Sequence, residues 1–224
     1  MQRGDAWAPV ITQVRRRVRT TTVEWDEPTL DACLAAIARA GRGGVVVGYS
    51  MGGRLALHAA VRDPRAYRAL VLVGATPGIE NEGRRRSRRA ADDELAQWME
   101  HSPIRAVVDH WENQPIFMTQ GAALVARQRR GRLSHDPKRL AALLRATGQG
   151  VLPPLWGELD KLRMPVLAVA GERDDKYAQI AERMAQRLPN GGSALIGGAG
   201  HAVHLEEPDA FAGLLLEFLD EHLG

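Results

Sequence analysis

The stretch Val45-Val46-Val47-Gly48-Tyr49-Ser50-Met51-Gly52 decides the fold of this 224-residue chain. Three consecutive valines are typical of a short strand that is buried on both faces of a parallel sheet. The pattern Gly-x-Ser-x-Gly follows directly, and helix-forming residues continue to Arg62, where Asp63-Pro64 ends the helix. A serine on so tight a strand-to-helix turn is held in a strained backbone with an exposed hydroxyl. The stretch therefore predicts a nucleophilic serine, Ser50, at the end of a sheet strand.

The residues around Ser50 also suit this turn. Gly48 and Gly52 are expected to avoid clashes with the neighbouring strand and helix, because glycine has no Cβ. The N-terminus of the following helix would point its free N–H groups and the positive end of its dipole at the hydroxyl. We expect the Met51 N–H to be one donor to an oxyanion.

A serine needs a histidine to accept its proton and a carboxylate to orient that histidine. Asp174 follows the buried-strand pattern of 165–171, and His201 follows the pattern of 193–197. The carboxyl ends of parallel strands meet at the same edge of a sheet, where such folds build their sites. The sequence therefore predicts a triad of Ser50, Asp174 and His201.

Each partner of Ser50 has a neighbour that could take its place. Asp175 adjoins Asp174, and we expect it to cap a helix over 176–188. His204 could serve instead of His201, but the glycine before His201 permits a tighter loop. The other histidines have no matched partners and are expected to be solvated or to lie in the core; they are His58, His101, His110, His135 and His222.

Composition bounds the class of protein. Apolar residues make up 45% and charged residues 25% of the chain, which is typical of a globular protein. No apolar run approaches the ~20 residues of a membrane span, and the N-terminus has no signal-peptide core. The single cysteine, Cys33, excludes an internal disulfide framework. We expect a cytoplasmic monomer or small homo-oligomer with no membrane insertion.

The basic residues are almost all arginine. The net charge is +3, and only three of the thirty basic residues are lysine. Arginine grips carboxylates and phosphates with a planar fork, so the bias suits a polyanionic small molecule, although a GC-rich genome would also produce it. The run 84–89 contains five arginines. No aromatic platform accompanies it, so we expect no nucleic-acid partner, and either cleft ligands or a solvated helix face.

Two further side chains are candidates for the site. Arg54 lies one helical turn beyond Ser50, where it is either an anion clamp or a surface arginine. Trp111, in Trp-Glu-Asn-Gln-Pro, either lines a pocket or belongs to a local core.

The alternation of strand and helix patterns predicts the architecture. Strand-like runs occur at 45–47, 69–74, 165–171 and 193–197, and a helix capped by Asp26, with Pro28 in its first turn, precedes the first of them. Residues 76–160 show only helical patterns, near 84–101, 103–111, 119–130 and 137–147. We expect a parallel α/β sheet with helices on both faces, divided into 1–75, a helical cap at 76–160, and 161–224.

Several stretches resemble one family of the α/β-hydrolase superfamily. The stretches are GYSMGGRLAL (48–57), LVLVGATPGI (70–79), the arginine run with Asp92, WENQPIF (111–117), LAALLRATGQG (140–150), GERDDKY (171–177) and GAGHAVHLEEP (198–208). The family is 2-succinyl-6-hydroxy-2,4-cyclohexadiene-1-carboxylate (SHCHC) synthase of menaquinone biosynthesis. The resemblance covers about residues 44–222, and the cap stretches distinguish this family from generic esterases.

The resemblance implies a lyase rather than a hydrolase. In the family, the histidine-activated serine removes a proton from a tricarboxylate substrate, and pyruvate is eliminated without metal or organic cofactor. Ser50 would be the base, His201 its activator and Asp174 the orienting group. The substrate-binding residues implied are Tyr49, Met51, Arg54, Arg88, Trp111 and Arg132, with Arg85, Arg89 or Arg130 as alternative carboxylate ligands.

The start of the chain departs from the family pattern. In the family, a His-Gly segment supplies a second oxyanion donor, and this sequence does not contain it. Asp5-Ala6-Trp7-Ala8-Pro9 resembles the stretch that comes directly after that segment. The fold is thus expected to be N-terminally abbreviated, with unpaired backbone beside the Ser50 strand. Two other functions stay open: a serine hydrolase acting on a small ester or thioester, and a non-catalytic remnant or binding module.

Overall fold

A four-stranded parallel sheet forms the centre of the computed structural model, which describes residues 4–223. Its strands are β1 (Val45–Tyr49), β2 (Ala69–Val73), β3 (Val166–Gly171) and β4 (Gly191–Ile196), and they lie side by side in chain order. The register pairs Val47 with Val71 and Leu72 with Ala168. All four strands point the same way, so their carboxyl ends meet at one edge of the sheet.

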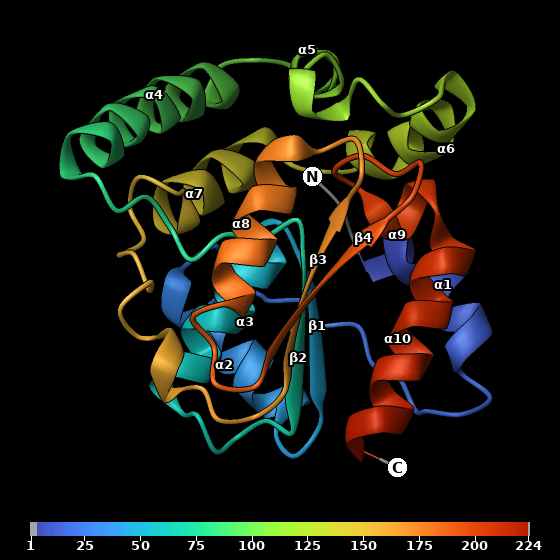
Figure 1. Ribbon diagram of the computed structural model, residues 1–224. Coiled ribbons are helices and arrows are strands. Elements are labelled where there is room, and N and C mark those ends of the chain that lie inside the picture. The colour runs from blue at the N-terminus through green and yellow to red at the C-terminus, as the bar shows by residue number, and fades with distance from the viewer. Residues whose placement is uncertain (1–3, 224) are drawn as a thin grey trace.

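Helices cover both faces of the sheet (Figure 1). One face carries α2 (Leu30–Gly41), α3 (Met51–Arg62) and α8 (Asp175–Ala185). The other carries α1 (Ala8–Val14) and α10 (Pro208–Leu223), with the short η1 (Gly4–Trp7) and α9 (Val203–Glu206) nearby. These layers agree with the expected α/β-hydrolase fold.

The apolar runs in the strands supply two cores at once. Successive side chains of a strand point to opposite faces. Leu70 and Leu72 therefore pack with α2, α3 and α8, whereas Val71 and Val73 pack with α1 and α10. Every residue of β2 and β3 is buried, which explains why these strands read as continuous apolar runs.

The chain between β2 and β3 is helical (Figure 1). It contains α4 (Glu82–Glu100), α5 (Ile104–Glu112), η2 (Pro115–Phe117), α6 (Ala122–Leu133), α7 (Pro137–Thr147) and η3 (Leu159–Lys161). Helices α4, α5 and α6 lie beyond the carboxyl ends of the strands, and α4 packs along α7. This insertion therefore stands over the edge of the sheet where the predicted triad residues meet.

The segment between α1 and α2 crosses the outer edge of β1. Val18 packs in the core on the α1 and α10 side, whereas Val23 and Trp25 pack in the core on the other face. Arg139 of α7 holds this segment by donating to the carbonyl oxygens of Trp25 and Asp26, at 2.5 and 2.6 Å. The segment contains no strand, and within residues 4–223 β1 pairs with β2 alone.

The start of α2 differs from the expectation. The sequence predicts Asp26 as N-cap with Pro28 in the first turn, but the helix begins at Leu30 with Thr29 as N-cap. The Thr29 side chain accepts a hydrogen bond from the Ala32 N–H at 3.2 Å. Both residues are typical caps by type. Tertiary contacts favour the later start, because Trp25 and Asp26 are held in the crossing segment by Arg139.

No helix within the described residues combines the length and the apolar character that a membrane crossing needs.

Candidate active site

Ser50 occupies a strained turn between β1 and α3. Its φ of 49° and ψ of −107° make it the one non-glycine residue with positive φ in the described part of the chain. The Ser50 N–H donates to the Val73 carbonyl at 2.8 Å, and the Ser50 carbonyl accepts from the Arg54 N–H at 3.1 Å. Strain of this kind persists only where the surroundings fix the backbone, and it is concentrated at functional sites. The prediction of a strained strand-to-helix turn at Ser50 is confirmed.

The glycines that permit this turn are Gly48 and Gly53. A Cβ on Gly48 would lie 2.7 Å from the Gly52 carbonyl oxygen. A Cβ on Gly53 would lie 2.6 Å from the Cβ of Ala75 and 2.8 Å from the Gly48 carbonyl oxygen. A Cβ on Gly52 would meet nothing within 4 Å, so the role expected of Gly52 falls to Gly53. The close approach involves Ala75 after β2, which the local Gly-x-Ser-x-Gly pattern does not contain.

The structure brings Ser50, His201 and Asp174 together in one hydrogen-bonded row. His201 Nε2 lies 3.1 Å from Ser50 Oγ, and His201 Nδ1 lies 2.7 Å from Asp174 Oδ2. A carboxylate only accepts, so Nδ1–H donates to Asp174 and leaves Nε2 free to accept the serine proton. The His201 side chain is 2% exposed and that of Asp174 is 10% exposed, which shields the row from bulk water.

Asp174 also begins the next helix. While Oδ2 contacts His201, Oδ1 accepts a hydrogen bond from the Tyr177 N–H at 3.3 Å, so Asp174 is the N-cap of α8. The expectation that Asp175 caps this helix is therefore wrong, since Asp175 is its first residue. One carboxylate serves both groups because its two oxygens point in different directions.

His204, the rival of His201, lies beside the row but takes no part in it. It is fully buried, its ring stacks on Trp7 at 4.2 Å and packs against Tyr49 at 4.5 Å, and neither ring nitrogen has a hydrogen-bond partner. Burial, with a smaller contribution from His201, lowers the pKa of His204 to about 3. His204 is thus a neutral packing residue.

The ring of Tyr49 packs against both His201 and His204. Its ring centroid lies 5.3 Å from that of His201, and its hydroxyl is buried without a hydrogen-bond partner. Burial, followed by the nearby carboxylate of Glu206, raises the pKa of Tyr49 well above its usual value. The Tyr49 hydroxyl is therefore a neutral group able to donate a hydrogen bond to a bound molecule.

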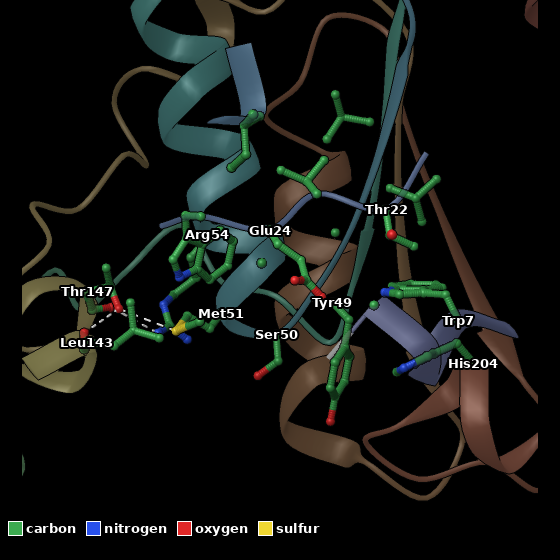
Figure 2. A pocket seen from close by; sticks show the side chains of 18 of the residues that line it. Trp7, Thr22, Glu24, Tyr49, Ser50, Met51, Arg54, Leu143, Thr147 and His204 are labelled. Carbon is green, nitrogen blue, oxygen red and sulfur yellow. Dashed lines mark hydrogen bonds between the residues drawn. The ribbon is translucent and has the colours of Figure 1, made fainter. Parts of the chain in front are cut away.

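A cavity of about 1630 Å³ opens over Ser50. Figure 2 shows Ser50 in this cavity, with Met51 and Arg54 reaching toward Thr147 on one side and Tyr49, His204 and Trp7 on the other. The cavity continues along β1, past the crossing segment. Five of the six predicted substrate-binding residues line it: Tyr49, Met51, Arg54, Arg88 and Trp111.

Arg54 is buried in the wall of the cavity. Its side chain donates from Nη2 to the Thr147 carbonyl at 3.1 Å, and its Nε has no partner. Burial, as the main cause, lowers the pKa of the guanidinium to about 10, so it stays charged at neutral pH. The Thr147 hydroxyl donates to the Leu143 carbonyl at 2.7 Å and lies 3.3 Å from the Met51 sulfur. The alternative of a surface arginine is wrong, because α7 covers this part of α3.

Arg88 is the arginine of the 84–89 run that faces the cavity. Its Nε donates to Asp92 Oδ1 at 2.8 Å, and Asp92 is 4% exposed. The other oxygen of Asp92 is buried without a partner. Arg85 and Arg89 do not line the cavity; Arg85 instead donates to the Ile79 carbonyl. The choice of Arg88 within this run thus agrees with the geometry of α4.

Arg132 is the predicted substrate-binding residue that lies outside the cavity lining. It is 2% exposed, and its Nη1 pairs with Glu112 Oε1 at 2.9 Å. Glu112 also pairs with Arg129. The counter-ion comes from α5, a different helix, so the sequence around Arg132 gives no sign of it. The alternative Arg130 does not line the cavity either.

Two aromatic residues of the site were not singled out in advance. Tyr177 lies with its ring 4.6 Å from that of His201, and Phe117 lies between Trp111 and His201, at 5.3 and 6.2 Å. Both occur in the stretches that carry the resemblance, GERDDKY and WENQPIF, which was the available signal. Within residues 4–223 no cluster of three or more histidine, cysteine or acidic side chains is placed to hold a metal ion.

Comparison with known proteins identifies the family of the chain and individual relatives of known name. The model of the alpha/beta hydrolase family matches residues 4–214. A relative from Salmonella typhimurium, named 2-succinyl-6-hydroxy-2,4-cyclohexadiene-1-carboxylate synthase, is 35% identical over 78% of this chain and 67% of its own length. A Bacillus subtilis relative that carries this name provisionally is 38% identical over 78% of this chain. The match spans 65% of that relative's length.

Solved structures agree with this assignment. The structure of MenH from S. aureus has a TM-score of 0.90 and 29% identity, and the match covers all of this chain and 91% of that one. An esterase from Thermogutta terrifontis, with a TM-score of 0.81 and 18% identity, shares the fold. The resemblance to SHCHC synthases that the motifs indicate is thus confirmed.

Proposed function

The chain belongs to the alpha/beta hydrolase family, and from that premise we propose that it is an SHCHC synthase, a carbon–oxygen lyase of menaquinone biosynthesis. The observation that carries the proposal is the 35–38% identity to proteins of that name over 78% of the chain. A match of that length includes the helical insertion between β2 and β3. The ordered row of Ser50, His201 and Asp174 supplies the chemistry.

The reaction removes one proton and one leaving group. The substrate is 2-succinyl-5-enolpyruvyl-6-hydroxy-3-cyclohexene-1-carboxylate, with one ring double bond, and the product has two. Ser50 gives its proton to His201 Nε2 and takes the proton from the ring carbon that bears the succinyl group. The released electron pair forms a ring double bond, the existing one shifts, and the C–O bond to the enolpyruvyl group breaks. The leaving enolate takes the proton from His201 and becomes pyruvate.

The charges of the cavity suit this substrate. The molecule carries three carboxylates, and the guanidinium groups of Arg54 and Arg88 line the same cavity as Ser50. Arginine binds carboxylates through charge-assisted hydrogen bonds that are roughly twice as strong as neutral ones. We assign Tyr49 and Trp111 to the same binding surface. We assign Arg132 as a further residue that binds a substrate carboxylate, once its ion pair with Glu112 opens.

The test is pyruvate release from freshly generated substrate by the purified chain. The Ser50→Ala variant is compared with Ser193→Ala, which removes an exposed hydroxyl from the amino-terminal half of β4, away from the carboxyl ends of the strands where the triad lies. We expect release by the wild type and by Ser193→Ala, and a loss of at least ~10³-fold in Ser50→Ala because the base is gone.

Three results would overturn the proposal. Equal release by Ser50→Ala and wild type would remove the serine from the mechanism. No release from folded wild-type protein, together with turnover of simple esters, would point instead to a hydrolase. Absence of both activities would favour a binding role.

A further inference from the structure

The loop that carries His201 is held by one carboxylate from beyond it. The loop runs from the end of β4 to α9, and Glu206 is the last residue of α9. Glu206 Oε2 accepts a hydrogen bond from the Gly200 N–H, and Oε1 accepts one from the Ala202 N–H, each at 2.9 Å. These amides stand directly before and after His201. A single side chain thus grips the backbone on both sides of the histidine.

The two N–H groups need acceptors within the protein because the loop is buried. Gly200, His201 and Ala202 are all buried, and a buried N–H without an acceptor is strongly disfavoured. Both carboxylate oxygens are acceptors, which is what two flanking N–H groups need. The two bonds hold the Ala199–Gly200 and His201–Ala202 peptide groups, so they constrain the backbone before and after His201 and therefore the place from which the imidazole starts.

The geometry points to Glu206 as a positioning residue that holds the His201 ring between Ser50 and Asp174. The inference rests on the proposed function in one respect, that His201 is the group that activates Ser50. Glu206 touches neither reacting atoms nor the ring nitrogens; it acts through the backbone of Gly200 and Ala202. Its loss is therefore expected to slow the chemical step more than it weakens substrate binding.

A matched control holds the same loop at another amide. Glu172 accepts a hydrogen bond from the Gly198 N–H at 2.9 Å, also from a side chain outside the loop. It holds one amide rather than two, and that amide lies three residues before His201. Glu172→Gln keeps one acceptor oxygen for its one amide. Glu206→Gln keeps one acceptor oxygen for two amides and turns an NH₂ group toward the other N–H.

The experiment uses readouts that need no enolpyruvyl substrate. The first is the rate at which a fluorophosphonate labels Ser50, which reports activation by His201. The second is the low-field proton resonance of the His201 Nδ1–H bound to Asp174, observed by NMR. The variants are Glu206→Gln, Glu206→Asp and Glu172→Gln, each with its melting temperature. Pyruvate release, as kcat and KM, is measured in parallel.

We expect Glu206→Gln to slow labelling at least tenfold and to broaden or remove the low-field resonance. Glu206→Asp, which keeps two acceptors on a shorter arm, should be intermediate. Glu172→Gln should stay within about twofold of wild type. In pyruvate release, kcat should fall while KM stays within about twofold.

A lowered melting temperature in Glu206→Gln with wild-type labelling and an intact resonance would overturn the inference, because the role would then be stability alone. If Glu206→Gln does not fold, the labelling rate of Glu206→Asp decides the question. A wild-type rate would contradict the inference, and an intermediate rate would support it. Pyruvate release can fail in every protein without affecting these outcomes, so the inference and the proposed function are tested separately.

Discussion

His204 is a buried histidine whose ring nitrogens have no partners, and burial lowers its pKa to about 3. In the unfolded chain its pKa returns to about 6.5. Between pH 3 and pH 6.5 the unfolded chain binds more protons than the folded chain. The contribution of His204 to the free energy of unfolding is therefore fully present above about pH 6.5 and decreases as the pH falls toward 3. The neutral ring, stacked on Trp7 and packed against Tyr49, therefore makes the fold sensitive to acid.

From this pKa, His204 should account for a loss of about 2 kcal/mol in unfolding free energy between pH 7.5 and pH 5. His204→Phe keeps a ring at this position and removes the titrating group. The loss of unfolding free energy between pH 7.5 and pH 5 should therefore be about 2 kcal/mol smaller in this variant than in the wild type. Urea unfolding at both pH values measures the difference. His101→Phe, at an exposed site, is the control and should behave as wild type. An equal acid loss in His204→Phe and wild type would contradict the assignment.

At the scale of elements, the approach of α3 to the sheet depends on Gly53. A Cβ there would come within 2.6 Å of Ala75 Cβ and 2.8 Å of the Gly48 carbonyl oxygen, whereas one on Gly52 would meet open space. Adding a methyl group to a tightly packed contact typically costs about 1–3 kcal/mol. Alanine is favoured over glycine in a helix by up to about 1 kcal/mol.

Gly53→Ala should therefore lower the unfolding free energy by up to about 2 kcal/mol, the packing cost less the helix preference of alanine, and slow the reaction, because α3 must move away from β1 and carry Ser50 with it. Gly52→Ala should be neutral or slightly stabilising. Denaturant unfolding and Ser50 labelling by a fluorophosphonate measure the two effects. The order of the two variants is the decisive result, and a larger loss in Gly52→Ala would refute it.

The elements that the sequence predicts well are those whose signal is local. The four strands lie within a few residues of the apolar runs, because strands buried on both faces must be apolar throughout. The triad follows for the same reason, since each member comes just after a strand. The predictions that failed depend on distant partners. Thr29 rather than Asp26 caps α2, because Arg139 of α7 holds Asp26 in the crossing segment.

The same reason explains the residues of the site that differ. The sequence of α6 does not reveal that Glu112 of α5 pairs with Arg132. The pattern around Ser50 does not reveal Ala75, which makes Gly53 the critical glycine. Glu206 is visible only once the loop is folded, because its partners are backbone amides and not side chains.

At the scale of the whole molecule, the cavity carries an excess of positive charge. Seven basic and five acidic side chains line it, and the chain as a whole has a net charge of +3. A cleft with a net positive charge raises the local concentration of an anionic substrate. The Debye length falls from about 30 Å at 0.01 M salt to about 3 Å at 1 M, so salt removes this attraction.

For a tricarboxylate substrate, kcat/KM should thus fall at least about fivefold between 0.01 M and 0.5 M sodium chloride, while kcat changes less than about twofold. Steady-state pyruvate release at several salt concentrations measures both. Sucrose at matched osmolality serves as the uncharged control and should leave kcat/KM in place. A flat salt profile would show that the cavity charges are locally neutralised.

Asp174 gives one carboxylate to two structures, because one oxygen orients His201 and the other starts α8. Residues of catalytic sites are commonly a burden on the fold, and proteins gain stability when they are replaced. Here one side chain contributes both to the catalytic row and to the start of a helix. A lineage released from selection for activity would still be selected to keep a capping residue at this position. Retention of Asp174 among relatives is therefore weak evidence of activity. The Ser50 side chain makes no capping hydrogen bond to α3 and contacts His201 instead, so Ser50 is the residue whose loss would record a change of function.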